Sequence, residues 1–248
     1  MTVDAPHLAL VAVVIAGAAA IKGAIGFGFP LLGVPLLSAI IGPRAAVPVI
    51  AVPTLLSNLI MVSRGSASRA STHLILAITG VAVGTLAGAA AITALDSRRL
   101  SVLVGAVALG YVIAAMFRLT ARVPEAAGRR AAPLVGLAAG VLGGATGILG
   151  PLLASYLHLL RMTGRDFVFW ITMMFFVGNI VQVASYAHLG LYAGRVLLLA
   201  LAGCIPMAIG TWSGMALQHR LDPVLFGRIV LGIVSLASIN LLARGLLR

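Results

Sequence analysis

The 248-residue chain is strongly apolar: 61% of its residues are hydrophobic, 9% are charged, and the mean hydropathy is +1.16. A soluble domain of this length needs roughly a quarter of its residues charged, so the composition excludes a soluble fold. It predicts an all-α polytopic membrane protein. The net charge of +12 would suggest nucleic acid in a soluble protein. Here arginines in loops that face anionic headgroups explain it, so the bilayer is the expected partner and nucleic acid is not.

Uncharged runs between charged residues predict the membrane segments, because about 20 apolar residues cross a bilayer. In chain order these runs cover residues 5–21, 23–43, 45–63, 70–95, 100–117, 131–160, 167–194, 196–219 and 229–243. Two of the runs carry a break, at Gly23–Pro30 and at Gly144–Pro151. Each half then holds four or five segments, depending on whether its broken segment crosses once or folds back. We therefore expect eight to ten segments with broken or short helices at these two places.

The two halves of the chain match each other in sequence. A shift of 121 positions places GAIGFGFP (23–30) on GATGILGP (144–151), Arg44 on Arg165 and Asn58 on Asn179. After a further slip of five residues, the aligned pairs are Gly84 with Gly210, Thr85 with Thr211, Gly88 with Gly214 and Asp96 with Asp222. These matches predict a duplication with a first transmembrane repeat over residues 1–120, a basic connector over 121–130 and a second repeat over 131–248.

The relative orientation of the halves follows from the broken segment. If each half crosses the membrane an odd number of times, the two repeats are inverted. If each half crosses an even number of times, the repeats are parallel. The loop arginines show about the same bias toward one side of the membrane in either arrangement, so the positive-inside rule does not distinguish them. We expect inverted repeats, because broken segments at matching positions are typical of inverted-repeat transporters.

The two breaks are the expected binding site. At an interrupted helix up to four N–H groups lack partners, and the helix dipole at that end favours an anion. Proline suits the first turn of the helix that restarts. The site residues predicted from the breaks are Gly23, Gly26, Phe27, Gly28, Pro30, Gly144, Thr146, Gly147, Gly150 and Pro151. The alternative is that the glycines only let helices approach, since Gly140 and Gly144 have small-xxx-small spacing.

Polar residues near the breaks extend the predicted site. Lys22 is the only lysine and directly precedes the first break, although it could also snorkel to the interface. Asn58, Asn179 and Gln182 could donate amide hydrogens to an oxyanion, or could bond between helices for purely structural reasons. All five acidic residues lie at segment ends or in loops. The sequence therefore favours an anionic ligand over a cation, and we expect no catalytic residue, metal site or cofactor.

Residues 22–48, KGAIGFGFPLLGVPLLSAIIGPRAAVP, and the repeat GATGILGP resemble the TauE/SafE sulfite exporter family, also called the 4-toluene sulfonate uptake permeases. The resemblance covers nearly the whole chain. It implies a multi-pass permease of the bacterial inner membrane for a small anion such as sulfite, a sulfonate or a related organosulfur or carboxylate compound. The expected mechanism is secondary transport by alternating access at the interface of the repeats. The alternatives are a passive anion channel and a non-transporting membrane scaffold, and a homodimer is one assembly open to the chain.

Overall fold

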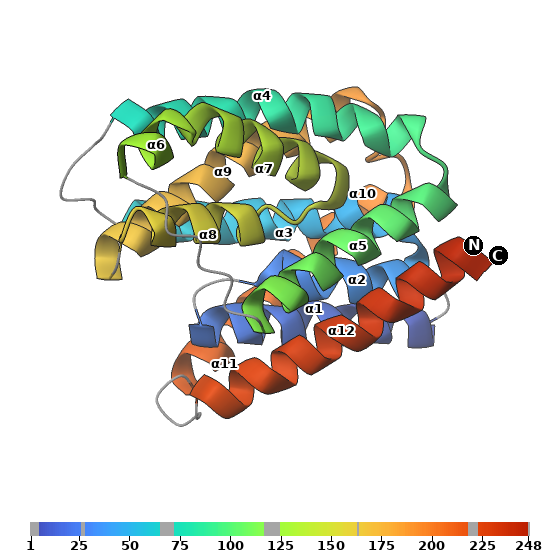
Figure 1. The fold of residues 1–248 in the computed structure, drawn as a ribbon. Coiled ribbons are helices and arrows are strands. Elements are labelled where there is room, and N and C mark those ends of the chain that lie inside the picture. The colour runs from blue at the N-terminus through green and yellow to red at the C-terminus, as the bar shows by residue number, and fades with distance from the viewer. Residues whose placement is uncertain are drawn as a thin grey trace.

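A computed structural model describes residues 5–25, 28–64, 72–116, 125–162, 164–217 and 223–247, and in these ranges every regular element is an α-helix (Figure 1). The helices in chain order are α1 Ala5–Ile25, α2 Phe29–Ile41, α3 Pro43–Arg64, α4 Thr72–Ala94, α5 Ser97–Met116, α6 Glu125–Arg130, α7 Ala132–Thr146, α8 Gly150–Leu159, α9 Gly164–His188, α10 Arg195–Ala202, α11 Cys204–Leu217 and α12 Pro223–Leu247.

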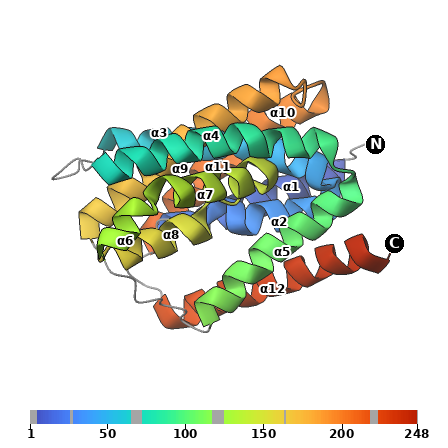
Figure 2. The same ribbon diagram turned by 45° about the horizontal axis from the view of Figure 1, so that its top comes forward.

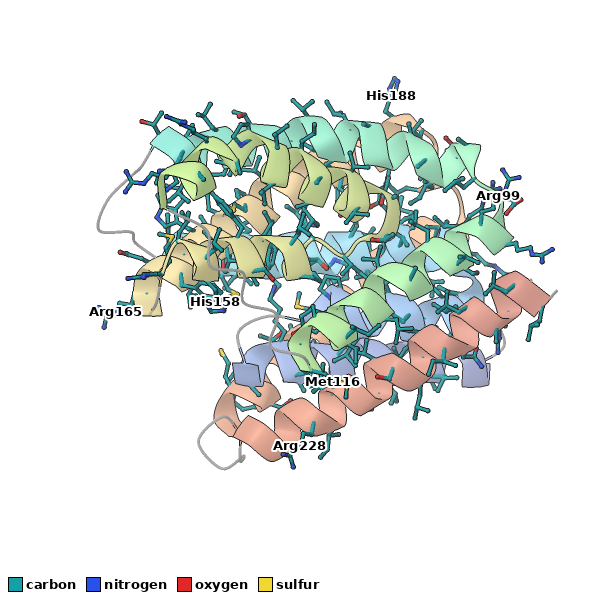
Figure 3. The ribbon with its side chains drawn as sticks, viewed as in Figure 1. Arg99, Met116, His158, Arg165, His188 and Arg228 are labelled. Carbon is teal, nitrogen blue, oxygen red and sulfur yellow. The ribbon has the colours of Figure 1, made fainter. Side chains whose placement is uncertain are left out.

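Six stretches of helix are long and apolar enough to cross a membrane: Pro43–Ser63, Thr72–Ala94, Ser97–Met116, Gly164–His188, Arg195–Leu217 and Gly227–Leu247. Large apolar side chains such as Trp212 and Leu236 point outward from them, as lipid contact requires. The labelled Arg165 and Arg99 lie at opposite ends of the bundle, outside this apolar belt (Figure 3). The prediction of an all-α polytopic membrane protein is thus confirmed.

The other apolar helices are α1, with 21 residues, and the shorter α2, α7 and α8, with 13, 15 and 10 residues. In the first half, α1 ends at Ile25 and α2 begins at Phe29, directly after Gly28, which has φ +101°. In the second half, α7 ends at Thr146, Gly147 has φ +77°, and α8 begins three residues further on. Glycine adopts these left-handed values without the penalty that a Cβ brings. The predicted interruption of both helices is confirmed.

Helices α4 and α7 pack backbone against backbone. A Cβ added to Gly84 on α4 would overlap the carbonyl oxygen of Leu137 on α7, and a Cβ added to Gly144 would overlap that of Thr85. Glycines at such positions let two membrane helices approach closely. Gly144 therefore takes the packing role that was the alternative to a binding role.

The same contacts recur between α1 and α11. A Cβ on Gly210 would overlap the carbonyl oxygen of Ala16, and one on Gly23 would overlap that of Thr211. A shift of Ala16 by 121 positions gives Leu137, and Gly84 aligns with Gly210 in the slipped register. The contacts between α1 and α11 therefore match those between α7 and α4 residue by residue.

Helices α5 and α12 lie side by side in both views (Figures 1 and 2). Arg98, near the start of α5, donates to the carbonyls of Gly245 and Leu246 at the end of α12. Further along, Gly105 lies against Ser238. The slipped register aligns α5 with α12 in sequence, and these two helices run antiparallel.

The predicted division into repeats at residues 120 and 131 remains a prediction. Residues 121–124 of the expected connector lie outside the described ranges, and the rest of it forms the short basic helix α6.

Candidate functional site

A small cavity of about 30 Å³ lies where the two breaks meet. It has room for one or two water molecules, so the site is closed around its centre in this structure. The predicted residues that line it are Lys22, Gly28, Pro30, Asn58, Gly147, Gly150, Pro151 and Asn179. Thus residues that stand far apart in the sequence, from both halves, share one cavity.

Two helices begin at this cavity. Pro30 lies in the first turn of α2 and Pro151 in the first turn of α8, and neither helix has a side-chain hydrogen bond at its N-cap. Free N–H groups in the first turn and the helix dipole give each N-terminus a partial positive charge. The N-termini of α2 and α8 therefore both place a partial positive charge at the same small cavity.

Lys22 places an amino group at the wall of the cavity, which carries a full positive charge when it is protonated. Its side chain is 5% exposed, and its Nζ donates a hydrogen bond to Asn58 Oδ1 at 2.7 Å. An ammonium has three donors, so two more are available. The acidic residues whose side chains are described lie at helix ends: Asp96 pairs with Arg99, and Asp166 lies in the first turn of α9. In the described part of the chain, no carboxylate therefore compensates the charge of Lys22.

A chain of buried hydrogen bonds connects Lys22 to the end of α7. Asn58 Nδ2 donates to Asn179 Oδ1 at 2.7 Å, and Asn179 Nδ2 donates to Gln182 Oε1 at 2.8 Å. Gln182 Nε2 donates to Tyr186 Oη at 2.8 Å and to the carbonyl of Gly143 at 2.9 Å. All these donors point away from Lys22. The chain joins the ammonium to residues of both halves, and hydrogen bonds in such a chain strengthen one another.

The two ends of the cavity are not equivalent. The residue that aligns with Lys22 is Gly143, where an added Cβ would overlap the side chain of Leu149. Leu149 thus fills the space that a second lysine would need. The cationic side of the site comes from α1.

Several predicted residues lie away from the cavity wall. Gly23 packs against α11, and the Thr146 hydroxyl donates to Leu142 O at 2.6 Å while it accepts from Ile148 N–H at 3.2 Å. The Thr146 hydroxyl therefore stabilises the C-terminal end of α7. Gln182 takes part through the hydrogen-bond chain, and Gly26 and Phe27 lie outside the described residues.

The structure adds residues that the sequence did not indicate. Tyr186 completes the hydrogen-bond chain by donating to the carbonyl of Gly144 at 2.6 Å, and its spacing of four from Gln182 could have revealed it. Tyr111 on α5 and Phe175 on α9 line the cavity, but no local pattern marks them. His158 lies away from the centre, stacked on Phe167 at 4.5 Å between ring centroids (Figure 3).

The fold and its centre define a multi-pass α-helical membrane protein with a buried cation between two interrupted helices. The model of the family "Sulfite exporter TauE/SafE" matches residues 9–241, and the chain therefore belongs to this family. A comparison with curated proteins and with solved structures finds no match. The family places the chain among membrane transporters of sulfur anions, and the inner membrane is their usual location in bacteria.

Proposed function

We propose that the protein is a secondary transporter that binds sulfite, a sulfonate or a related small organosulfur or carboxylate anion between its two breaks. The observation that carries this proposal is the buried ammonium of Lys22, which faces two helix N-termini and, among the described residues, no carboxylate. A buried charge is unfavourable unless it is paired. An oxyanion supplies the missing partner.

The arrangement suits an oxyanion with several acceptor atoms. Lys22, with two remaining donors, and the first turns of α2 and α8 border the same cavity. Charge-assisted hydrogen bonds of this kind are about twice as strong as neutral ones. The same cavity disfavours a cation, because its described lining residues include the Lys22 ammonium and the first turns of two helices but no carboxylate.

Alternating access is supported by the relation between the halves. Asn58 and Asn179, which are 121 positions apart, bond to each other, and equivalent contacts tie α1 to α11 and α7 to α4. Since the aligned helices α5 and α12 run antiparallel, we propose an inverted duplication with its two-fold axis near this asparagine pair. Broken helices at the interface of inverted repeats form the substrate site in many secondary transporters.

The two proposed repeats differ in conformation. Helix α2 packs against α12, where Arg244 donates to the carbonyl of Ala39 at 2.8 Å. Between the matching helices α8 and α5 lies a cavity of about 260 Å³. In an inverted-repeat transporter, the second state exchanges the conformations of the repeats, so that α8 approaches α5 while α2 leaves α12.

Counterflow in proteoliposomes tests this function. Vesicles loaded with unlabelled sulfite should accumulate external labelled sulfite transiently, whereas chloride loading should not drive uptake. Saturable counterflow supports an alternating-access transporter. Ohmic anion current without counterflow would identify a channel instead, and the absence of both would refute anion transport.

A further inference from the structure

We infer that Lys22 takes up a proton when an anion binds and releases it when the anion leaves, so that the protein moves the anion and a proton together. The inference rests on the proposed function, because it concerns the charge balance of the same site. Lys22 is 5% exposed, and its Nζ donates to Asn58 Oδ1 at 2.7 Å. Among the described residues, no carboxylate lines the cavity that Lys22 borders. The buried amino group therefore has an amide as partner but no counter-charge of its own.

The empty site favours the neutral amine over the ammonium. Burial disfavours the charged form of a side chain unless an opposite charge lies nearby. The cavity instead receives the N-termini of α2 and α8, whose partial positive charges repel an ammonium. An anion in the cavity reverses this balance, because it pairs with the ammonium and with both N-termini. Anion binding and protonation of Lys22 therefore strengthen each other, as linkage requires.

The hydrogen-bond chain fits both forms of Lys22. An amine and an ammonium both have a hydrogen to donate to Asn58 Oδ1, so loss of the proton leaves the bond between Asn58 and Asn179 in place. The next member of the chain, Gln182, is again an amide, and amides do not titrate. We therefore place the entry of the proton on the cavity side, where the anion also enters.

Tyr111 is the other titratable side chain among the described lining residues of the cavity. A phenol is ordinarily neutral at physiological pH, so it supplies no counter-charge. Helices α2 and α7 carry no titratable residue. On the other helices at the cavity, and on α11 that packs against α1, the remaining titratable residues are His7 on α1, Arg44 and Arg64 on α3, Arg98 and Arg99 on α5, Tyr156 and His158 on α8, Arg165, Asp166, Tyr186 and His188 on α9, and Cys204 on α11. None of those whose side chains are described lines the cavity, which leaves Lys22 as the group that changes charge there.

The transport cycle then balances one proton for each anion. On the loading side, the neutral amine takes a proton from water as the anion enters. On the other side the anion leaves, the ammonium loses its partner, and the proton returns to water. For a monovalent sulfonate the net charge moved is zero, whereas a lysine that stayed charged throughout would let each anion carry its negative charge across alone.

Calorimetric titration of the purified full-length protein measures the protons taken up for each bound anion, when it is repeated in two buffers of different ionisation enthalpy. The probes are methanesulfonate, which stays a monoanion between about pH 6 and pH 9, and sulfite, which itself takes up a proton in this range. We expect the uptake to approach one proton per methanesulfonate as the pH rises. The dissociation constant should then rise by up to about tenfold per pH unit.

Two variants show which group holds the proton. In Lys22→Arg the guanidinium stays charged at every pH used, so methanesulfonate should bind to this variant without proton uptake. Any uptake that remains with sulfite belongs to sulfite itself. Tyr111→Phe is the matched control, because it removes the other titratable group at the cavity, and its proton uptake should equal that of the unchanged protein.

Transport gives an independent readout. A pH-sensitive dye trapped in proteoliposomes should report acidification of the lumen during methanesulfonate uptake. A membrane potential that is negative inside should not slow this uptake, since the anion and the proton together carry no net charge. Uptake that such a potential suppresses, without acidification, would overturn the inference.

The binding data separate this inference from the proposed function. Methanesulfonate binding without proton uptake in the unchanged protein would overturn the inference and leave the proposed function standing. Equal proton uptake in Lys22→Arg would also overturn it. If Lys22→Arg does not fold, methanesulfonate binding to the unchanged protein and to Tyr111→Phe decides, and if only sulfite binds, the difference in uptake between the unchanged protein and Lys22→Arg decides. Loss of all anion binding would refute both.

Discussion

Replacement of Lys22 by methionine separates a binding lysine from a structural one. Methionine keeps the length and apolar stem of the side chain but removes the ammonium. If Lys22 binds the anion, the substitution should weaken binding without weakening the fold. If Lys22 is only part of the hydrogen-bond chain, both anion binding and the stability of the fold should decrease.

The expected magnitudes follow from the environment of Lys22. Removal of a hydrogen bond to a charged group costs about 1.5–3 kcal/mol, which corresponds to a rise of roughly 10- to 150-fold in the dissociation constant for the anion. For stability, a charge in a membrane helix costs about 2.5–3.5 kcal/mol, and the substitution relieves this cost. It also leaves Asn58 Oδ1 without its donor, at a cost of about 1–3 kcal/mol. The melting temperature should therefore stay unchanged or rise.

Two measurements on one preparation check this prediction: calorimetric titration with sulfite, and thermal unfolding of the protein without ligand. Arg228→Met is the matched control, because it removes an exposed positive charge on α12 (Figure 3) from a residue that does not line the cavity. It should change neither quantity beyond a small salt-dependent effect. Wild-type sulfite affinity in Lys22→Met would refute the reasoning, and so would a fall in melting temperature that accounts for the lost binding.

The remaining predictions concern packing and the breaks. Gly88→Ala should lower the free energy of unfolding by about 1–3 kcal/mol, because its Cβ would overlap a carbonyl oxygen on α7, whereas Gly17→Ala, with open space around it, should raise it by about 0.5–1 kcal/mol. Equal thermal shifts in the two variants would contradict this. Gln182→Leu should cost about 1–3 kcal/mol, because it leaves the buried Asn179 without its acceptor, and chemical unfolding measures this loss. Gly147→Ala should lower both the melting temperature and the affinity for sulfite, since alanine disfavours its φ of +77° by about 1–2 kcal/mol. Normal counterflow and stability in that variant would count against a role for the second break.

The sequence was sufficient for the features that depend on local chemistry. An apolar run of membrane length forms a helix, since lipid cannot bond to a free backbone, and a cluster of glycines that ends in proline, as at Gly144–Pro151, favours an interruption. The same features that break the helices also carry the family resemblance. Hence the class of protein, the interruptions and the family were all predictable from the residues.

The roles of individual glycines were not predictable. Gly23 and Gly144 begin the two motifs, yet each packs against another helix, while Gly28 and Gly147 border the cavity. Sequence spacing alone cannot separate these roles, because it does not show which neighbour a glycine meets.

The amino-acid sequence by itself determined that the chain crosses the membrane, where its helices break, and that its one lysine stands next to a break. Only the tertiary structure decided that Lys22 reaches Asn58 and, through it, Asn179 of the other half, and that Tyr111 stands between a small charged cavity and a larger apolar one. The physical reason is that hydropathy and backbone propensity act over a few residues. The partners of a buried polar group are set by helix packing between segments that here lie from 36 to 121 residues apart in the sequence.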